Sequence, residues 1–295
     1  MGQASNDASE QPAFRGRVLI VAGSDSGGGA GIQADIKSVT ALGGFAATAV
    51  TAITIQNTLW VSGVIGLDPK VVRAQMQAVL GDIGADCLKT GMLGDRKLIE
   101  AVVEAADDLA RDVPRVVDPV MVATSGDRLL PADAVDAMRQ LMVPGAVLVT
   151  PNAPEAEVLT GKAVETLDGQ RRAAERLLEM GAVAALVKGG HIGSPDSDEP
   201  IIDVLAMQSG ERFLDGPRIR TSSTHGTGCS LASGVAAGLA RGLDLVDAVD
   251  LARAYLVEAI RRAPGLGRGH GPIDHGWPSR DPEGFAELYS RYRVQ

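Results

Sequence analysis

Uninterrupted apolar runs alternate along the chain with stretches whose apolar residues recur at helical spacing. The apolar runs predict strands at residues 17–22, 46–55, 60–67, 87–90, 116–121, 146–150 and 184–187. The helical spacing predicts helices at residues 32–42, 69–80, 95–110, 131–141, 170–180, 231–240 and 244–262. Residues 201–207 and 212–214 are expected to form a hairpin. This order of elements predicts an α/β fold with a mainly parallel sheet and helices on both faces.

A glycine-rich segment, residues 23–31, lies between the first predicted strand and the first predicted helix. In open α/β sheets the loops that follow strand carboxyl ends line the ligand crevice, so this layout indicates a binding loop. The glycines do not fit G-x-G-x-x-G, because Ile32 occupies the last position, and the sequence contains no G-x-x-x-x-G-K-[ST]. Neither a dinucleotide fingerprint nor a P-loop is therefore supported.

A second glycine turn, residues 222–230, runs directly into the small and apolar stretch 231–240. A buried helix that begins at this turn would direct free N–H groups and the positive end of its dipole outward, which favours an anion such as phosphate. Cys229 lies in the expected first turn, where a thiol pKa falls below its usual value of about 8.5, so it is a candidate proton acceptor. Taken alone, the turn is equally consistent with a glycine-rich loop and a small core cysteine.

Length and composition favour one large domain. The chain has 295 residues, 45% of them hydrophobic, which is enough for one core. We expect a disordered leader at 1–16, a single domain at 17–277, and a tail at 278–295 with one short helix near Phe285.

Charge and cysteine content exclude several classes of protein. The net charge of -9 disfavours a nucleic-acid or anionic-membrane surface, and the two cysteines, Cys87 and Cys229, show no metal-type spacing. The first residues lack the apolar core of a signal peptide, and the longest apolar stretch, 45–55, is too short to span a bilayer. A cytoplasmic location is therefore expected.

Polar residues fall at or just after the carboxyl ends of the predicted strands. They are Asp25, Gln56, Asp118, Asn152 with Glu155, and Lys188. Parallel strands bring such ends to one sheet edge, where phosphoryl transfer would find cations, amides and a base. Asp118 and Glu155 are candidate ligands of Mg²⁺, which needs only one or two carboxylates, and Lys188 is a point charge suited to a nucleotide phosphate.

Each of these residues also has a structural interpretation. Asp118 could cap a turn, Asn152 and Glu155 could be the N-cap and N3 residues of the next helix, and Lys188 could be a solvated loop lysine. Gln56 could satisfy backbone groups at a strand end.

The remaining candidates are predicted to be structural. Met92 is more typical of core filling than of a ligand wall. No ligand spacing relates the four histidines, which are His191, His225, His270 and His275.

Several segments together resemble one known family. They are residues 22–35, 56–58, 89–93, 118–121, 150–155, 187–191, 224–229 and 270–273, with Trp277. From about Val18 to Trp277 the chain resembles the hydroxymethylpyrimidine/phosphomethylpyrimidine kinase family, the thiamin-pathway branch of the ribokinase-like superfamily. Two positions depart from the family pattern: Ser26 replaces a frequent proline, and Ser223 replaces an Asn or Asp.

The resemblance implies a three-layer αβα ribokinase-like fold and an ATP- and Mg²⁺-dependent kinase, expected to be a homodimer. Its substrate would be 4-amino-5-hydroxymethyl-2-methylpyrimidine, phosphorylated first on the alcohol and then on the monophosphate. A vitamin B6 kinase that acts on pyridoxal or pyridoxine is the main alternative. A cysteine-nucleophile hydrolase and a non-catalytic pyrimidine or nucleotide sensor are weaker ones.

The resemblance also implies roles for individual residues. The residues that would hold the pyrimidine are Gly23, Asp35, Gln56, Met92 and Val120. Those that would serve ATP are Asn152, Glu155, Lys188, Thr224 and Thr227. Asp118 and Glu155 would bind the metal, Gly226 and Gly228 would form the anion hole, and Cys229 would be the base where most sugar kinases have an aspartate.

Overall fold

The computed structural model describes residues 16–121, 131–194 and 197–292. Its strands are β1 (Arg17–Ser24), β2 (Phe45–Gln56), β3 (Val61–Gly66), β4 (Cys87–Thr90), β5 (Arg115–Val117), β6 (Leu148–Val149), β7 (Ala184–Val187), β8 (Ile201–Met207) and β9 (Gly210–Gly216). Its α-helices are α1 (Gly31–Ala41), α2 (Pro69–Asp82), α3 (Arg96–Leu109), α4 (Ala132–Ala137), α5 (Ala153–Thr160), α6 (Leu167–Glu179), α7 (Thr227–Ala240), α8 (Leu245–Arg261), α9 (Trp277–Arg280) and α10 (Pro282–Tyr289).

The strands form one sheet in the order β3-β2-β1-β4-β5-β6-β7-β8-β9. The centre, from β2 to β7, is parallel. The antiparallel strands lie at the edges: β3 pairs with β2, and β8 pairs with β7 and β9. The predicted mainly parallel sheet and the predicted hairpin are both confirmed.

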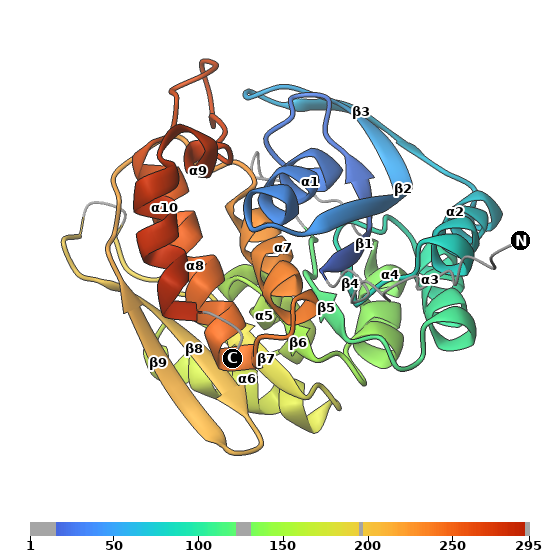
Figure 1. Cartoon of the computed structure of the whole chain (residues 1–295). Helices are drawn as coiled ribbons and strands as arrows, with labels where there is room; N and C mark the ends of the chain where they lie inside the picture. The colour runs from blue at the N-terminus through green and yellow to red at the C-terminus, as the bar shows by residue number, and fades with distance from the viewer. Residues whose placement is uncertain (1–15, 122–130, 195–196, 293–295) are drawn as a thin grey trace, which may run out of the picture.

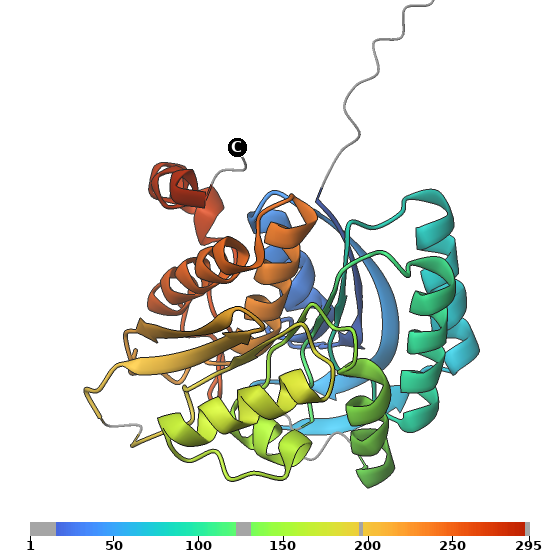
Figure 2. The same cartoon turned by 90° about the horizontal axis from the view of Figure 1, so that it is seen from below.

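Helices cover both faces of the sheet, as Figures 1 and 2 show. In β1, Leu19 and Val21 join the core under α2, α3 and α6, whereas Val18 and Ile20 join the core under α1, α7 and α8. Successive side chains of a strand point to opposite faces, so a strand covered on both sides must be apolar throughout. This explains the apolar run without alternation and confirms the three-layer αβα fold.

Glycines allow α7 to lie close against α8. A Cβ on Gly234 would lie 2.9 Å from the Cβ of Ala252, and a Cβ on Gly238 would lie 2.9 Å from the Cβ of Ala248. Nearly every residue of α7 after its first turn is buried, as its small and apolar composition predicts. The helix therefore enters the site from a fixed, packed position.

Some predicted boundaries differ from the structure. β5 ends at Val117, before Asp118, because Pro119 has no N–H to continue a ladder. The helix predicted at 131–141 is α4 followed by a π-helical turn, Met138–Met142.

The ends of the chain are described only in part. The leader predicted for residues 1–16 lies outside the described residues except for Gly16. The tail helix predicted near Phe285 is α10, and the preceding short helix α9 was not predicted. The ring of Trp277 meets that of Phe285 edge to face, with centroids 5.5 Å apart, so this part of the tail packs on the domain. Over the described ranges, none of the helices combines the length and the apolar character needed to cross a membrane.

Candidate active site

The loops that follow β5 and β7 meet the amino-terminal turn of α7. A Cβ placed on Gly228 would lie 3.2 Å from Lys188 Nζ and 3.8 Å from each carboxylate oxygen of Asp118. Lys188 Nζ is itself 3.5 Å from Asp118 Oδ1. A lysine, an acid and a helix amino terminus thus converge at the carboxyl edge of the sheet, as the positions of these residues predicted.

The amino terminus of α7 is shaped to receive an anion. Gly226 is the N-cap residue in the left-handed region, with φ of 80°, and no side chain in the described ranges caps the helix. A Cβ on Gly226 would also collide with the carbonyl of Gly29, so only glycine fits there. The first N–H groups of α7 after that of Thr227, together with the helix dipole, therefore remain available to a phosphate. Thr224 and Thr227 frame this turn, and Thr227 N donates to Thr224 O at 3.3 Å.

Asp118 has one oxygen engaged and one oxygen unpaired. Its Oδ1 accepts from Thr150 Oγ1 at 3.2 Å and faces Lys188. Its Oδ2 is buried and has no hydrogen-bond partner among the described residues. A buried carboxylate oxygen without a donor is costly unless a ligand or ion satisfies it, so Asp118 is a candidate ligand of a cation.

Asn152 and Glu155 form a capping box at the start of α5. Glu155 N donates to Asn152 Oδ1 at 2.9 Å, and Asn152 N donates to Glu155 Oε2 at 2.8 Å. The N-cap interpretation of the sequence is therefore confirmed. Burial raises the pKa of Glu155 to about 7; Lys188 opposes this rise and Asp118 adds to it.

The donor set fits a hydrated Mg²⁺. Within the described part of the chain, no group of three or more His, Cys, Asp or Glu side chains could hold a metal ion. Asp118 and Glu155 together supply two carboxylates, and Mg²⁺ commonly completes its shell with waters and substrate phosphates. The unpaired Asp118 Oδ2 is the observation that favours this assignment.

The thiol of Cys229 does not have the lowered pKa that its helix position predicted. Burial raises the pKa of Cys229 to about 12, although Lys89 and a backbone N–H of Gly31 act in the opposite direction. The carboxylates of Asp35 and Asp118 raise it further. The prediction of a lowered pKa was wrong because it weighed the helix terminus without the desolvation of the thiolate.

Two of the residues predicted to hold the substrate lie in contact. A Cβ on Gly23 would be 2.5 Å from Met92 Cε, so the glycine leaves room for the thioether. Val120 is half-buried beside Asp118, where Val120 N donates to Asp118 O at 2.8 Å.

Asp35 lies in a buried ion pair. Its side chain is 0% exposed, and its Oδ1 lies 2.8 Å from Lys89 Nζ and accepts from Ser233 Oγ at 2.7 Å. These contacts engage Oδ1, whereas the buried Oδ2 has no hydrogen-bond partner among the described residues, so the substrate contact predicted for Asp35 stays a prediction. The sequence indicated neither this ion pair nor Lys89 as a member of the site, since the two residues lie 54 positions apart.

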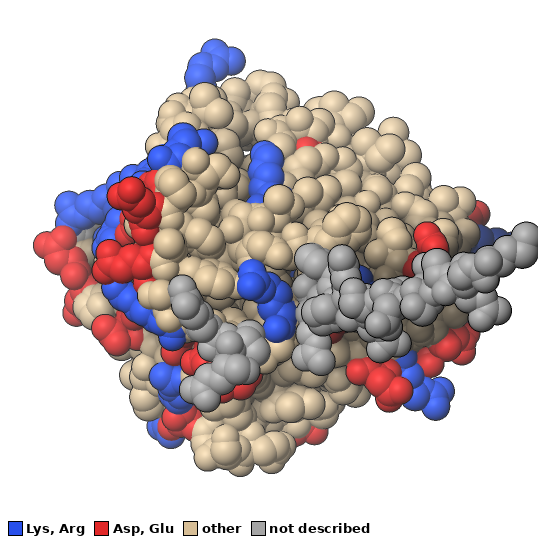
Figure 3. All heavy atoms as spheres, in the orientation of Figure 1, with Lys and Arg blue, Asp and Glu red and all other residues tan. Residues whose placement is uncertain are grey.

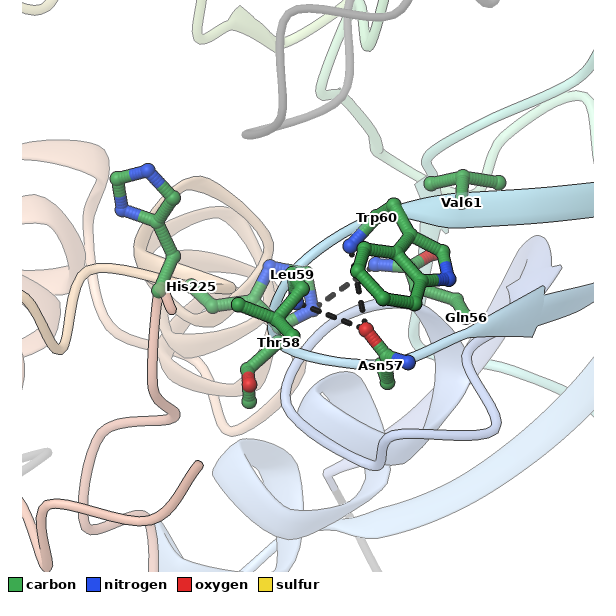
Figure 4. A pocket seen from close by; sticks show the side chains of 8 residues that line it. Gln56, Asn57, Thr58, Leu59, Trp60, Val61 and His225 are labelled. Atoms are coloured by element: carbon green, nitrogen blue, oxygen red, sulfur yellow. Dashed lines mark hydrogen bonds between the residues drawn. The ribbon is translucent and has the colours of Figure 1, made fainter. Parts of the chain in front are cut away.

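Gln56 meets a histidine that was predicted to be structural. Gln56 Nε2 lies 3.1 Å from His225 Nε2, and the same ring nitrogen lies 2.9 Å from Asp25 Oδ2. Figure 4 shows Gln56 and His225 facing one another beside the loop that joins β2 and β3. They line a hollow of about 10 Å³, which has room for about one water molecule. The sequence signals for His225 were its position within the second glycine turn, residues 222–230, and within segment 224–229 of the family resemblance.

Comparison with known proteins identifies the family. A family model described as phosphomethylpyrimidine kinase matches residues 25–274. The chain belongs to this family. A hydroxymethylpyrimidine/phosphomethylpyrimidine kinase from Streptomyces coelicolor is 46% identical over 260 residues, which are 88% of this chain and 94% of the relative. The family, the fold and the class of kinase predicted from the sequence are confirmed, and ATP is the co-substrate of that class.

A longer relative and two solved structures extend the comparison. The thiamine biosynthesis bifunctional protein ThiED of Geobacter sulfurreducens is 48% identical over 90% of this chain, which spans only 53% of that protein. A phosphomethylpyrimidine kinase structure from Clostridium difficile has 36% identity and a TM-score of 0.73, covering 83% of this chain and 99% of that one. The ADP complex of Bacillus subtilis pyridoxal kinase has 33% identity and a TM-score of 0.82, covering 89% of this chain and 98% of that one.

Proposed function

We propose that this kinase phosphorylates 4-amino-5-hydroxymethyl-2-methylpyrimidine on its alcohol and then phosphorylates the monophosphate to the diphosphate, in thiamin biosynthesis. The observation that carries the proposal is the convergence of Gly228, Lys188 and Asp118 around the open amino terminus of α7. Phosphoryl transfer depends mainly on such positioning and charge stabilisation. The relatives' names supply the choice of acceptor.

In this proposal each part of the site has one task. The turn at Gly226 and Gly228 holds the transferring phosphoryl group, and Lys188 neutralises a nucleotide phosphate. Asp118 and Glu155 hold Mg²⁺, which supplies charge neutralisation on the phosphates when bound. The substrate hydroxyl oxygen attacks the γ-phosphorus, the bond to ADP breaks, and the hydroxyl proton passes to Cys229 Sγ, which accepts it as the thiolate.

Pyridoxal phosphorylation is the second candidate, since the pyridoxal kinase from Bacillus subtilis superposes with the higher TM-score of the two structures above. Incubation of the purified enzyme with ATP, Mg²⁺ and each acceptor separates the two. We expect faster turnover of the hydroxymethylpyrimidine, with both the mono- and the diphosphate resolved by chromatography. Faster turnover of pyridoxal would reverse the order of the two candidates.

Lys188→Ala is expected to raise the KM for ATP by about 10- to 100-fold, because a charged hydrogen bond to phosphate contributes about 1.5–3 kcal/mol. The KM for the pyrimidine should change much less. Steady-state kinetics at saturating levels of the other substrate measure both values. Lys97→Ala, on an exposed lysine of α3, is the control and should leave both unchanged. An unaltered ATP constant in Lys188→Ala would remove this lysine from the nucleotide site.

The homodimer is proposed to form through the exposed face of β2 and β3. Ile53, Ile55 and Ile65 are 47%, 56% and 58% exposed, and Ile53 pairs with Ile65 across the two strands. Figure 3 shows few charged side chains over these strands. An apolar patch at a sheet edge is typical of a protein interface.

Ile65→Lys is therefore expected to convert the dimer to a monomer, because it places a charge at the centre of this patch. Light scattering after size-exclusion chromatography gives the mass. Val183→Lys, at an exposed valine before β7, is the control. A wild-type monomer, or a dimer that Ile65→Lys leaves intact, would contradict the assignment. The absence of nucleic-acid binding stays a prediction from the net charge of -9, and a cytoplasmic location stays a prediction as well.

A further inference from the structure

One nitrogen of His225 faces two different groups. His225 Nε2 is 2.9 Å from Asp25 Oδ2 and 3.1 Å from Gln56 Nε2. The side chains of Asp25 and His225 are buried, and Gln56 is half-buried. A ring nitrogen carries either one hydrogen or one lone pair, so it cannot donate to the carboxylate and accept from the amide at the same time.

The carboxylate of Asp25 decides whether His225 Nε2 carries a hydrogen or a lone pair. Asp25 is strongly committed to the ionised state: its Oδ1 accepts from Gly27 N at 2.8 Å, and its Oδ2 accepts from Gly29 N at 3.0 Å and from Ala30 N at 2.8 Å. Burial alone would raise the pKa of Asp25, but its bonds to His225 and to these N–H groups bring it below its ordinary value. A bare Nε2 lone pair would point at this anion, whereas an Nε2–H donates to it.

The amide of Gln56 must adapt to that proton. A hydrogen bond to an ionised acceptor is roughly twice as strong as one between neutral groups, so Asp25 outweighs Gln56 in setting the state of the ring. With a hydrogen on Nε2, an amide NH2 in the same place would set two donors against each other. The oxygen and nitrogen of a glutamine amide occupy nearly the same volume, and a half-turn of the amide brings the oxygen to the ring.

We propose that Asp25 and His225 are a positioning pair that holds a proton on His225 Nε2, turning the amide oxygen of Gln56 toward the ring and its NH2 group toward the substrate. The site then selects a ligand that offers a hydrogen-bond acceptor at this point, such as an unprotonated ring nitrogen. This inference rests on the proposed role of Gln56 in holding the pyrimidine. It adds Asp25 and His225 as residues that act through Gln56. It also specifies that the Gln56 amide donates the hydrogen bond to the substrate.

The backbone around His225 keeps the ring in this place. A Cβ on Gly29 would lie 2.5 Å from His225 Cδ2, so the ring packs directly on the glycine loop. His225 N donates to Gly271 O at 3.1 Å, which ties the residue to the segment after α8. The next residue, Gly226, is the N-cap of α7. The pair therefore links the pyrimidine contact to the phosphate turn without a flexible joint.

The protonation state is tested first, on the whole enzyme without substrate. Nitrogen-15 spectra of histidine-labelled protein, assigned by comparison with His225→Gln, are expected to show a protonated Nε2. An unprotonated Nε2 would overturn the proposal. In Asp25→Asn the preference for a protonated Nε2 should weaken or disappear. Retention of the wild-type spectrum would mean that Asp25 does not set the state of the ring.

The effect on binding is tested by a double-mutant cycle. Asp25→Asn is expected to raise the KM for the hydroxymethylpyrimidine about 10-fold or more while kcat changes far less. In a Gln56→Ala background the same substitution should add almost nothing, because its effect passes through Gln56. Asp86→Asn is the matched control: Asp86 accepts from the backbone N–H groups of Gly16 and Arg17 at the opposite end of β1, and its variant should leave KM unchanged.

The possible outcomes distinguish a failure of the Asp25–His225 positioning pair from a failure of the proposed role of Gln56 in holding the pyrimidine. Additive effects of Asp25→Asn and Gln56→Ala would show that Asp25 shapes the loop alone, and the positioning pair would be rejected. A KM that Gln56→Ala leaves unchanged would instead reject Gln56 as a substrate residue, while the spectra still decide the state of His225.

Discussion

Replacing Cys229 with alanine is expected to lower kcat by about 10²–10⁴-fold, the usual contribution of a general base, with little change in the KM for ATP. The reason is positional. Cys229 follows Gly228, whose Cα faces Lys188 and Asp118, in the first turn of α7, so its thiolate form can take the proton of an incoming alcohol. Alanine removes the acceptor and leaves the turn, the lysine and the acid in place. Single-turnover kinetics with both substrates saturating measure the chemical step.

The other cysteine provides the control. Cys87 is buried in β4. Cys87→Ala also replaces a thiol with a hydrogen atom, but it does so in the core and leaves the turn at Gly226 and Gly228 unchanged. It should keep kcat while losing some stability. Cys229→Asp should retain more activity than Cys229→Ala, since a carboxylate can also accept a proton. Equal losses of kcat and of ATP affinity in Cys229→Ala would show that the residue shapes the site and transfers no proton.

The raised pKa of Cys229 predicts how its contribution depends on pH. With the pKa raised to about 12, the thiol is protonated at neutral pH, so the thiolate that accepts the proton becomes more abundant as pH rises. The ratio of wild-type kcat to that of Cys229→Asp should therefore increase between about pH 7 and pH 9. Glu155, whose pKa is raised to about 7, titrates in both proteins and cancels in the ratio. A constant ratio would argue that substrate binding lowers the thiol pKa into the neutral range.

The fold was predictable because a strand buried on both faces of the sheet must be apolar at every position, and such a run is easily recognised in the sequence. The β1 run is apolar at every position from Val18 to Ala22 because each side chain packs under one helical layer or the other. Boundaries were less accurate where a local group ended a strand, as Pro119 does after β5. The tail helix α9 has only four residues, too few for a periodic pattern.

The site was predictable only where strand ends decide position. Asp118 and Lys188 could be placed because parallel strands bring their carboxyl ends together. The contact between Asp25 and His225 joins residues 200 positions apart, and no spacing rule reports it. The pKa of Cys229, a half-buried residue, depends on how far the fold removes its thiol from water, which is a property of the packed molecule and not of a helix position.

The second large effect concerns stability, and it arises from the buried pair of Lys89 and Asp35. Lys89→Met is expected to lower the free energy of unfolding by about 3–5 kcal/mol, the cost of leaving one charge of a buried pair without its partner. Both side chains are 0% exposed, and the distance from Lys89 Nζ to Asp35 Oδ1 is 2.8 Å. Burial disfavours the Lys89 ammonium, but Asp35, Cys229 and Asp118 together outweigh it, so the pKa of Lys89 lies above its ordinary value. Urea unfolding followed by circular dichroism measures the change.

Two further variants separate the charge effect from the loss of packing. Arg73→Met breaks a 2.7 Å ion pair with Asp108 whose side chains are 37% and 59% exposed, and it should change stability by less than about 1 kcal/mol. Adding Asp35→Leu to Lys89→Met removes both buried charges and should restore much of the lost stability, since an apolar pair of similar volume carries no desolvation penalty. If the double variant is no more stable than Lys89→Met, the lost energy comes from packing, and the buried charge is not its cause.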